Sequence, residues 1–170
     1  MHNTVQGFAA AFRAAGFGVA FNANMDAWKR YHVALGAPET NAMYMAGSCN
    51  YRLARNREAL GKMIRGMCEG FAVLKAHGYP IEPKGMRLLA TLPDLLLTLP
   101  FRIVMRIMDI GGARHARNAR EEMAHLSEQL LGLADDAEVP VPTLRELHRH
   151  ALRPAAAGWA VDVASTPALA

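Results

Sequence analysis

The stretch "ARNREALGKMIRGMCEGFAVLKA", residues 54–76, decides the fold class. Its large apolar residues recur every three or four positions, which places them on one face of a helix: Leu60, Met63, Ile64, Met67, Phe71 and Leu74. Glu58 and Lys62 are four residues apart and form a favourable ion pair on the outer surface. Gly78 then suits the end of the helix. The stretch predicts a long amphipathic helix packed against a core.

The N-terminal segment shows the same spacing. Residues 4–15 place their apolar side chains on one helical face: Val5, Phe8, Phe12 and Ala15. Gly16 suits the end of this helix. The following "FGVAF", residues 17–21, is rich in residues that favour β-structure, and it fits either a strand or an extended connection.

A second helix is expected to begin near Asn24 or Asp26, because both residues are good N-caps. It should run toward Gly47. Pro38 lies inside this range, and proline removes a backbone N–H and clashes with the preceding turn. We therefore expect a break or kink near Ala37, and a buried element, because such a kink needs tertiary support.

The region after the long helix contains several prolines. Residues 84–108 predict one or two helices, divided at Pro93 and Pro100. Residues 109–118, "DIGGARHARN", predict a glycine-containing loop or a loop that leads into a helix.

The C-terminal part predicts two further helices. In residues 118–134 the apolar residues follow a helical stripe: Ala119, Met123, Leu126, Leu130 and Leu133. Thr143 and Glu146 form a T-x-x-E capping box for a last helix at 144–152. Residues 153–170 are rich in alanine and proline and predict a disordered tail.

Composition agrees with a globular all-α protein. The chain has 170 residues, of which 52% are hydrophobic and 20% charged, and this length suits one domain, at residues 1–152. The net charge is +4, but Lys and Arg are scattered, which does not favour nucleic-acid binding. Residues 88–108 are apolar, but prolines and charges interrupt them, which argues against a membrane span.

The location expected from the sequence is cytoplasmic. Cys49 and Cys68 show no C-x-x-C spacing and fit a reducing compartment. Residues 1–20 lack the order of a secretory signal.

Three kinds of site receive little support. "GFGVAF", residues 16–21, contains G-x-G without a preceding strand or a third glycine, so it fits a helix C-cap better than a dinucleotide loop. A metal site is conceivable from residues that lie close in sequence, but nothing marks a third ligand: His115, Glu121, Glu122 and His125. Cys68 is expected to be buried, whereas Cys49 stays open as a nucleophile.

The remaining chemistry lies at Trp28, Lys29, Arg30 and Glu122. The first three residues fit two interpretations. They are either an ordinary solvated start of a helix or a group of side chains that faces a pocket.

Three long segments, in this order, resemble the C-terminal domain of the ketopantoate reductase (2-dehydropantoate 2-reductase) family, in a divergent branch. They are "FAAAFRAAGFGVAFNANMDAWKR" at 8–30, "YRLARNREALGKMIRGMCEGFAVLKAHGYPI" at 51–81 and "NAREEMAHLSEQLLGLADDAEVPVPTLREL" at 118–147. The resemblance covers roughly residues 5–152. It implies an all-α domain with a fold like the C-terminal domain of 6-phosphogluconate dehydrogenase.

The resemblance also implies a function in pantothenate biosynthesis. Members of the family reduce a 2-keto acid with NADP(H), which an N-terminal Rossmann domain binds. A lysine two residues after a tryptophan protonates the substrate carbonyl, and a glutamate helps to place it. These positions correspond to Arg30, with Lys29 beside it, and to Glu122. Substrate contacts are implied for Trp28, His32 and Asn118.

The sequence departs from the family pattern at the proton donor. Arg30 keeps its proton at ordinary pH, so it can bind a carboxylate but is a poor proton donor. Lys29 lies about 100° around the helix and would need a local change of register. Ala34 and Pro38 replace the usual asparagines, and Ile110 stands near an expected serine.

The nucleotide-binding half is not present in the sequence, so this chain alone is expected to bind no cofactor. A Rossmann-fold partner would supply NADP(H), and a homodimer is an additional expected partner. The alternative hypothesis is a non-catalytic helical dimerisation or ligand-binding module.

Overall fold

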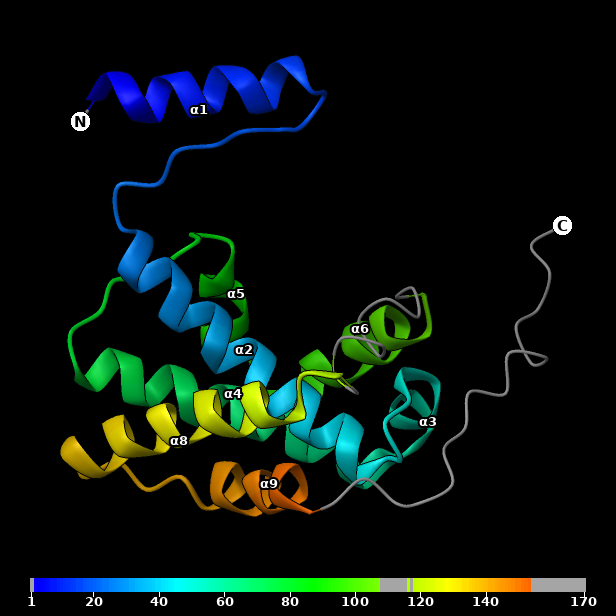
Figure 1. Ribbon diagram of the computed structural model, residues 1–170. Coiled ribbons are helices and arrows are strands. Elements are labelled where there is room, and N and C mark those ends of the chain that lie inside the picture. Colours follow the sequence, from blue (N-terminus) through cyan, green and yellow to red (C-terminus); the bar gives the residue numbers. More distant parts are fainter. Residues whose placement is uncertain (1, 108–115, 117, 154–170) are drawn as a thin grey trace, which may run out of the picture.

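The computed structural model describes residues 2–107, 116 and 118–153, and this part is all-helical (Figure 1). It contains eight helices and no strand. The helices are α1 (His2–Ala14), α2 (Met25–Met45), α3 (Asn50–Arg55), α4 (Arg57–Ala76), α5 (Met86–Thr91), α6 (Asp94–Ile107), α8 (Arg120–Asp136) and α9 (Pro142–Leu152). The predicted all-α class is therefore confirmed for the described residues.

Helix α4 lies at the centre and packs against α2, α3, α5, α6, α8 and α9. The apolar stripe predicted from its sequence is buried along its whole length. Asn56 caps the helix, because its side chain accepts a hydrogen bond from the Ala59 amide at 3.0 Å. The predicted pair of Glu58 and Lys62 is present at 2.5 Å, and Lys62 also binds Glu146 at 2.8 Å.

Helix α2 crosses α4 and continues through Pro38, so the predicted break near Ala37 does not occur. Pro38 is buried against α4. A Cβ atom added at Gly66 would lie 3.1 Å from the Cβ of Pro38, and one added at Gly70 would lie 3.1 Å from the Cβ of Ala34. The two glycines thus let α2 and α4 approach closely, and the packing around Pro38 offsets the lost hydrogen bond.

The start of α9 differs from the predicted capping box. Pro142 takes the first helical position, so Thr143 lies inside the helix and does not cap it. Glu69 of α4 accepts hydrogen bonds from the amides of Thr143 and Leu144 instead, at 3.1 and 2.8 Å. Glu146 is bound to Lys62 and not to the helix start.

The end of α9 is held by Arg120 of α8. Its guanidinium donates to the carbonyls of His150 and Arg153 at 2.7 and 3.1 Å. The same group lies 3.8 Å from the ring centre of Tyr44, which belongs to α2. Both ends of α9 are thus satisfied by side chains from other helices.

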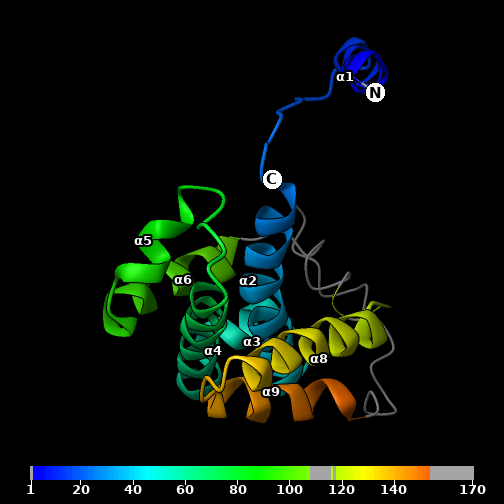
Figure 2. The same ribbon diagram turned by 90° about the vertical axis from the view of Figure 1, so that its left-hand side faces the viewer.

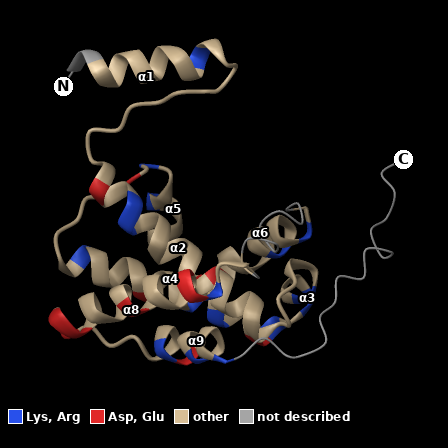
Figure 3. Ribbon diagram, in the orientation of Figure 1, with Lys and Arg blue, Asp and Glu red and all other residues tan. Residues whose placement is uncertain are grey.

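Helix α1 stands apart from the other helices in both views (Figures 1 and 2). Its expected range is confirmed, but Val5, Phe8 and Phe12 are exposed to solvent and do not join the core. Arg13 is the only Lys or Arg residue in this helix, and the helix has no acidic residue, so it looks almost uncharged in Figure 3. Residues 17–21 form an extended connection and no strand.

The proline-rich region forms two helices, α5 and α6, which are separated at Pro93 as predicted. Pro100 does not divide them further, because it lies inside α6. No helix in the described ranges is long and apolar enough to cross a membrane. Most of the predicted loop at 109–118, with Ile110 and His115, and the predicted tail beyond Arg153 lie outside the described residues.

Candidate functional site

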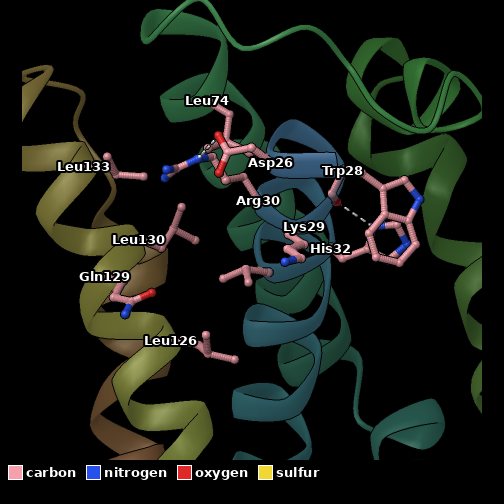
Figure 4. A pocket seen from close by; sticks show the side chains of 11 residues that line it. Asp26, Trp28, Lys29, Arg30, His32, Leu74, Leu126, Gln129, Leu130 and Leu133 are labelled. Atoms are coloured by element: carbon pink, nitrogen blue, oxygen red, sulfur yellow. Dashed lines mark hydrogen bonds and ion pairs between the residues drawn. The ribbon is translucent and has the colours of Figure 1, made fainter. Parts of the chain in front are cut away.

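A pocket of about 430 Å³ lies between α2 and α8 (Figure 4). Helix α2 contributes its polar side chains and α8 contributes most of the apolar ones. The lining residues are Asp26, Trp28, Lys29, Arg30, His32, Val33, Leu74, Leu126, Gln129, Leu130 and Leu133. The volume falls within the usual range for small-molecule sites, roughly 300–1,000 Å³.

Arg30 points toward α8 and is already engaged by its neighbours. Its Nε donates to the carboxylate of Asp26 at 2.9 Å. Its guanidinium also lies over the ring of Tyr79, at 4.6 Å from the centroid. The hydrogen bond with Asp26 raises the pKa of Arg30 above its ordinary value. Arg30 therefore stays charged, and Asp26 balances much of that charge.

Lys29 lines the same pocket and is exposed. No hydrogen bond or ion pair joins its ammonium group to another residue in the described part of the chain. Lys29 reaches the pocket without a change of helical register, because the pocket follows a broad face of α2 that includes both residues 29 and 30. The pocket thus holds one cation that Asp26 balances and one cation that has no acidic partner among the described residues.

Trp28 and His32 form a stacked pair, with ring centroids 3.7 Å apart. Both residues belong to the lining of the pocket, but Figure 4 shows their rings on the side of α2 that faces away from Arg30 and α8. The Nδ1 atom of His32 lies 2.7 Å from the carbonyl oxygen of Trp28. Because a carbonyl only accepts, Nδ1 carries the proton, and Nε2 of the neutral ring is an acceptor.

Asn118 and Glu122 do not line this pocket. Together with Ala119, Arg120 and Glu121 they line a second hollow of about 700 Å³, at the beginning of α8. Glu122 lies one turn before Leu126, or about 6 Å along the helix. The structure therefore brings Trp28, Lys29, Arg30 and His32 together around one pocket and separates Asn118 and Glu122 from them.

Sequence reasoning missed Asp26, Gln129 and Tyr79 as neighbours of the site. The i,i+4 spacing of Asp26 and Arg30 is a local signal that predicts their ion pair. Gln129 falls on the same helical face as Leu126 and Leu133, so its position follows from periodicity. Tyr79 has no local signal, because it reaches Arg30 from the turn after α4.

Both cysteines are half-buried and free. Burial, together with the nearby carboxylate of Asp94, raises the pKa of the Cys68 thiol to about 11. Its Sγ lies 3.5 Å from Asp94. Cys68 is thus protonated at neutral pH and is a poor nucleophile.

The described residues hold no cluster of three or more side chains that could bind a metal ion. His125 contacts Gln129 at 3.0 Å and Glu128 at 3.9 Å. His115 lies outside the described residues.

Gly16 has a positive φ of 85° and ends α1. The amides of Gly16 and Phe17 donate to the carbonyls of Arg13 and Phe12, both at 3.0 Å, which is the Schellman pattern of a helix C-cap. The G-x-G at 16–18 is therefore a helix end, as its sequence indicated.

Comparisons with protein-family models, with curated proteins and with solved structures find no match to this chain. The resemblance to ketopantoate reductases therefore rests on the sequence segments alone.

Proposed function

We propose that this chain is the substrate-binding helical domain of a ketopantoate-reductase-like oxidoreductase that reduces a 2-keto acid with NADP(H). In this proposal the helices adopt a fold like the C-terminal domain of 6-phosphogluconate dehydrogenase. Two observations support it. Three segments follow the family order in the sequence, and the pocket between α2 and α8 lies at the segment that carries the family's tryptophan.

The proposal rests mainly on one observation, which is that Lys29 lines the pocket and is exposed to solvent there. A small 2-keto acid has one carboxylate, one carbonyl and an aliphatic part. The ammonium of Lys29, which pairs with no other residue in the described part of the chain, offers a charge-assisted hydrogen bond for the carboxylate or the carbonyl. Leu126, Leu130 and Leu133 offer an apolar wall for the aliphatic part.

The roles of the two cations follow from their surroundings. Lys29 can give up a proton to a carbonyl oxygen that gains charge, which is general-acid catalysis. Arg30 is held by Asp26 and Tyr79, and its proton is not available. Arg30 therefore orients the substrate in this proposal. Glu122 and Asn118 take no part in the described arrangement, because they line a different hollow.

The described residues form no strand, and Gly16 ends α1, so the G-x-G at 16–18 is not the glycine loop of a Rossmann dinucleotide site. In this proposal a Rossmann-fold domain, on the same polypeptide or on another, holds the cofactor. The uncovered apolar side chains of α1, Val5, Phe8 and Phe12, supply surface for such a partner.

A binding experiment tests the proposal without the partner. Small 2-keto acids, beginning with ketopantoate, are titrated into the protein while amide and side-chain NMR signals are followed. We expect shifts at Lys29, Arg30 and Gln129. Lys29→Met should raise Kd about 10-fold or more, because a charge-assisted hydrogen bond is lost.

Lys75→Met is the matched control, because Lys75 is exposed on the last turn of α4 and lies outside the pocket. It should leave Kd unchanged. An equal loss in both variants, or no binding of any 2-keto acid, would contradict the proposal. NADPH oxidation with ketopantoate by the chain alone would show that the assignment of the cofactor to a partner is wrong.

A further inference from the structure

Helix α6 carries large apolar side chains on its outer side, away from the core. Leu97 and Met105 on its inner side belong to the core, where α6 packs against α3 and α4. At about 100° per residue, Leu99 and Ile103 lie on the opposite side of the helix. The aliphatic residues of this outer face are between 50% and 82% exposed: Leu95, Leu96, Leu99, Ile103 and Ile107.

The charges beside this face are basic. Arg102 and Arg106 come three residues after Leu99 and Ile103, so each arginine lies next to one of these side chains on the helix surface. No acidic residue pairs with either arginine in the described part of the chain. Asp94 is the one acid of α6, and it accepts a hydrogen bond from the Cys68 thiol of α4 at 3.5 Å. The acid of α6 therefore lies on the side of the core, and its cations lie toward the outer face.

Helix α3 adds positive charge beside α6. The two helices pack against each other, and the side chain of Asn50 in α3 donates to the carbonyl of Met105 at 3.1 Å. Helix α3 contains no acidic residue, and its Arg52 and Arg55 are exposed (Figure 3). Exposed charges act over about 8 Å at physiological ionic strength. These arginines can therefore attract an anionic surface that approaches α6.

We propose that the outer face of α6 binds the surface of an anionic lipid bilayer, with the helix lying parallel to the membrane plane. An interfacial helix buries its apolar face about 5–10 Å into the bilayer, and its basic residues stay among the headgroups. Arg102 and Arg106 can reach the lipid phosphates from the helix, because the carbon stems of arginine side chains lie along apolar surface. Arg52 and Arg55 of α3 add electrostatic attraction.

The side chains of this face favour lipid over a protein partner. The exposed large apolar residues of α6 are Leu, Ile and Val, and none is aromatic. Protein interfaces depend mainly on Trp, Tyr and Arg, whereas Leu and Val are under-represented among their energetically important residues. Acyl chains require only apolar area. The inference is independent of the proposed function, because no residue of the α2–α8 pocket takes part.

Vesicle binding is the first test. The full chain is floated with vesicles of phosphatidylcholine mixed with phosphatidylserine, and with vesicles of phosphatidylcholine alone. Binding to the neutral vesicles should be about 30-fold or more weaker, because the arginines lose their attraction. Added salt should weaken binding to the anionic vesicles. Soluble glycerophosphoserine should not compete, since it offers no apolar phase for the outer face.

A charge on the apolar face gives the second test. Leu99→Glu should weaken binding to the anionic vesicles about 10-fold or more, because a carboxylate would enter the acyl region. Leu152→Glu is the matched control, since Leu152 and Leu99 are 58% and 64% exposed. Leu152 ends α9, which packs against α2, α4 and α8, so this variant should bind as the unsubstituted protein does. Circular dichroism should show unchanged helix content in both variants.

Removal of positive charge gives the third test. Arg106→Gln should weaken binding about fivefold, and Arg102→Gln together with Arg106→Gln about 25-fold, because each basic residue contributes separately near an anionic surface. Arg145→Gln removes the same net charge from α9 and is the control. An equal loss in Arg106→Gln and Arg145→Gln would show that only net charge matters and would contradict the assignment to α6.

A fluorescent label reports insertion directly. Leu99→Cys with an environment-sensitive fluorophore should shift its emission to the blue when anionic vesicles are added, whereas labelled Leu152→Cys should not. The unsubstituted protein controls for labelling of Cys49 and Cys68.

Other results would overturn the proposal. These are no binding to anionic vesicles at low salt, or an equal loss of binding in Leu99→Glu and Leu152→Glu. Binding that Phe8→Glu abolishes and Leu99→Glu leaves intact would assign the membrane contact to α1. A protein complex that Leu99→Glu breaks, without any vesicle binding, would assign the outer face to a protein partner.

Discussion

Helices α4 and α6 are both rich in large apolar residues, but those of α4 are buried, whereas many of those of α6 are exposed to solvent. The apolar residues of α4 form one stripe, and charged residues such as Glu58, Lys62 and Arg65 occupy the outer side. In α6 a narrow polar row of Asp94, Thr98, Arg102 and Arg106 interrupts the apolar surface, and the neighbouring helices cover only the side of Leu97 and Met105, so large apolar side chains elsewhere on the helix stay exposed. The difference teaches that apolar residues confined to one stripe can all be buried by neighbouring helices, whereas a wider apolar surface leaves some large side chains exposed.

The largest expected effect tests this comparison with one chemical change in both helices. Leu60→Ala in α4 should lower the free energy of unfolding by about 3 kcal/mol, because Leu60 is 2% exposed and its removal leaves a cavity. Leu99→Ala in α6 should cost less than about 0.5 kcal/mol in the monomer. Urea unfolding at low protein concentration measures both. Similar costs would show that α6 is covered in solution.

A partly buried acid in α2, Glu39, gives the second effect. Burial raises the pKa of Glu39 from 4.5 to about 7. The folded protein thus binds this proton more tightly than the unfolded chain, so the contribution of Glu39 to stability is most favourable below pH 4.5 and is lost as the pH rises through 7. Glu39→Gln should stabilise the protein by about 2 kcal/mol at pH 8 and leave it nearly unchanged at pH 4. Thermal unfolding at both values measures this, and a gain that is independent of pH would contradict it.

Two arginines on different surfaces give a smaller contrast. Arg120→Met should cost about 1–2 kcal/mol, because it leaves the last carbonyls of α9 without their donor and removes the contact with Tyr44. Arg145 pairs only with exposed Asp135 among the described residues. Arg145→Met should therefore cost less than about 0.5 kcal/mol. Denaturant midpoints compare the two, and equal shifts would disprove the role of Arg120.

The smallest effect compares two helical glycines, at which substitution by alanine should change the stability of the protein in opposite directions. Gly132→Ala in α8 should stabilise the protein by about 0.7 kcal/mol, since nothing lies within 4 Å of the added Cβ. Gly70→Ala in α4 should destabilise it by about 1 kcal/mol, because the added Cβ meets Ala34 at 3.1 Å. A gain in stability at both positions would mean that α2 and α4 can separate slightly without loss.

The helices could be predicted from sequence where their pattern is local. The stripe of α4 alternates with charges at every turn, so both the helix and its buried face follow from periodicity. The break predicted at Pro38 does not occur, because the packing that keeps α2 continuous comes from Gly66 on another helix, whereas the predicted burial of this element is confirmed. The cap of α9 was missed for the same reason, since Glu69 lies 74 residues before the amide of Thr143 that it binds.

The candidate site shows the same limit. Lys29 and Arg30 could be selected because two cations beside Trp28 at a helix start are a local feature. Which of the two cations is balanced depends on Tyr79 as well as on Asp26, and only the fold brings Tyr79 near. Counting along the chain selected Glu122, which lies on α8 one turn before Leu126, the first residue of α8 that lines the pocket.

The two ends of α9 have a consequence for cooperativity. Its first amides are bound by Glu69 of α4, and its last carbonyls are bound by Arg120 of α8. Neither end can fray without breaking a contact between helices, so the amides of α9 should exchange hydrogen with solvent only when the whole body opens. The exchange rates of the α9 amides would then report the free energy of global unfolding, although this helix has only 11 residues.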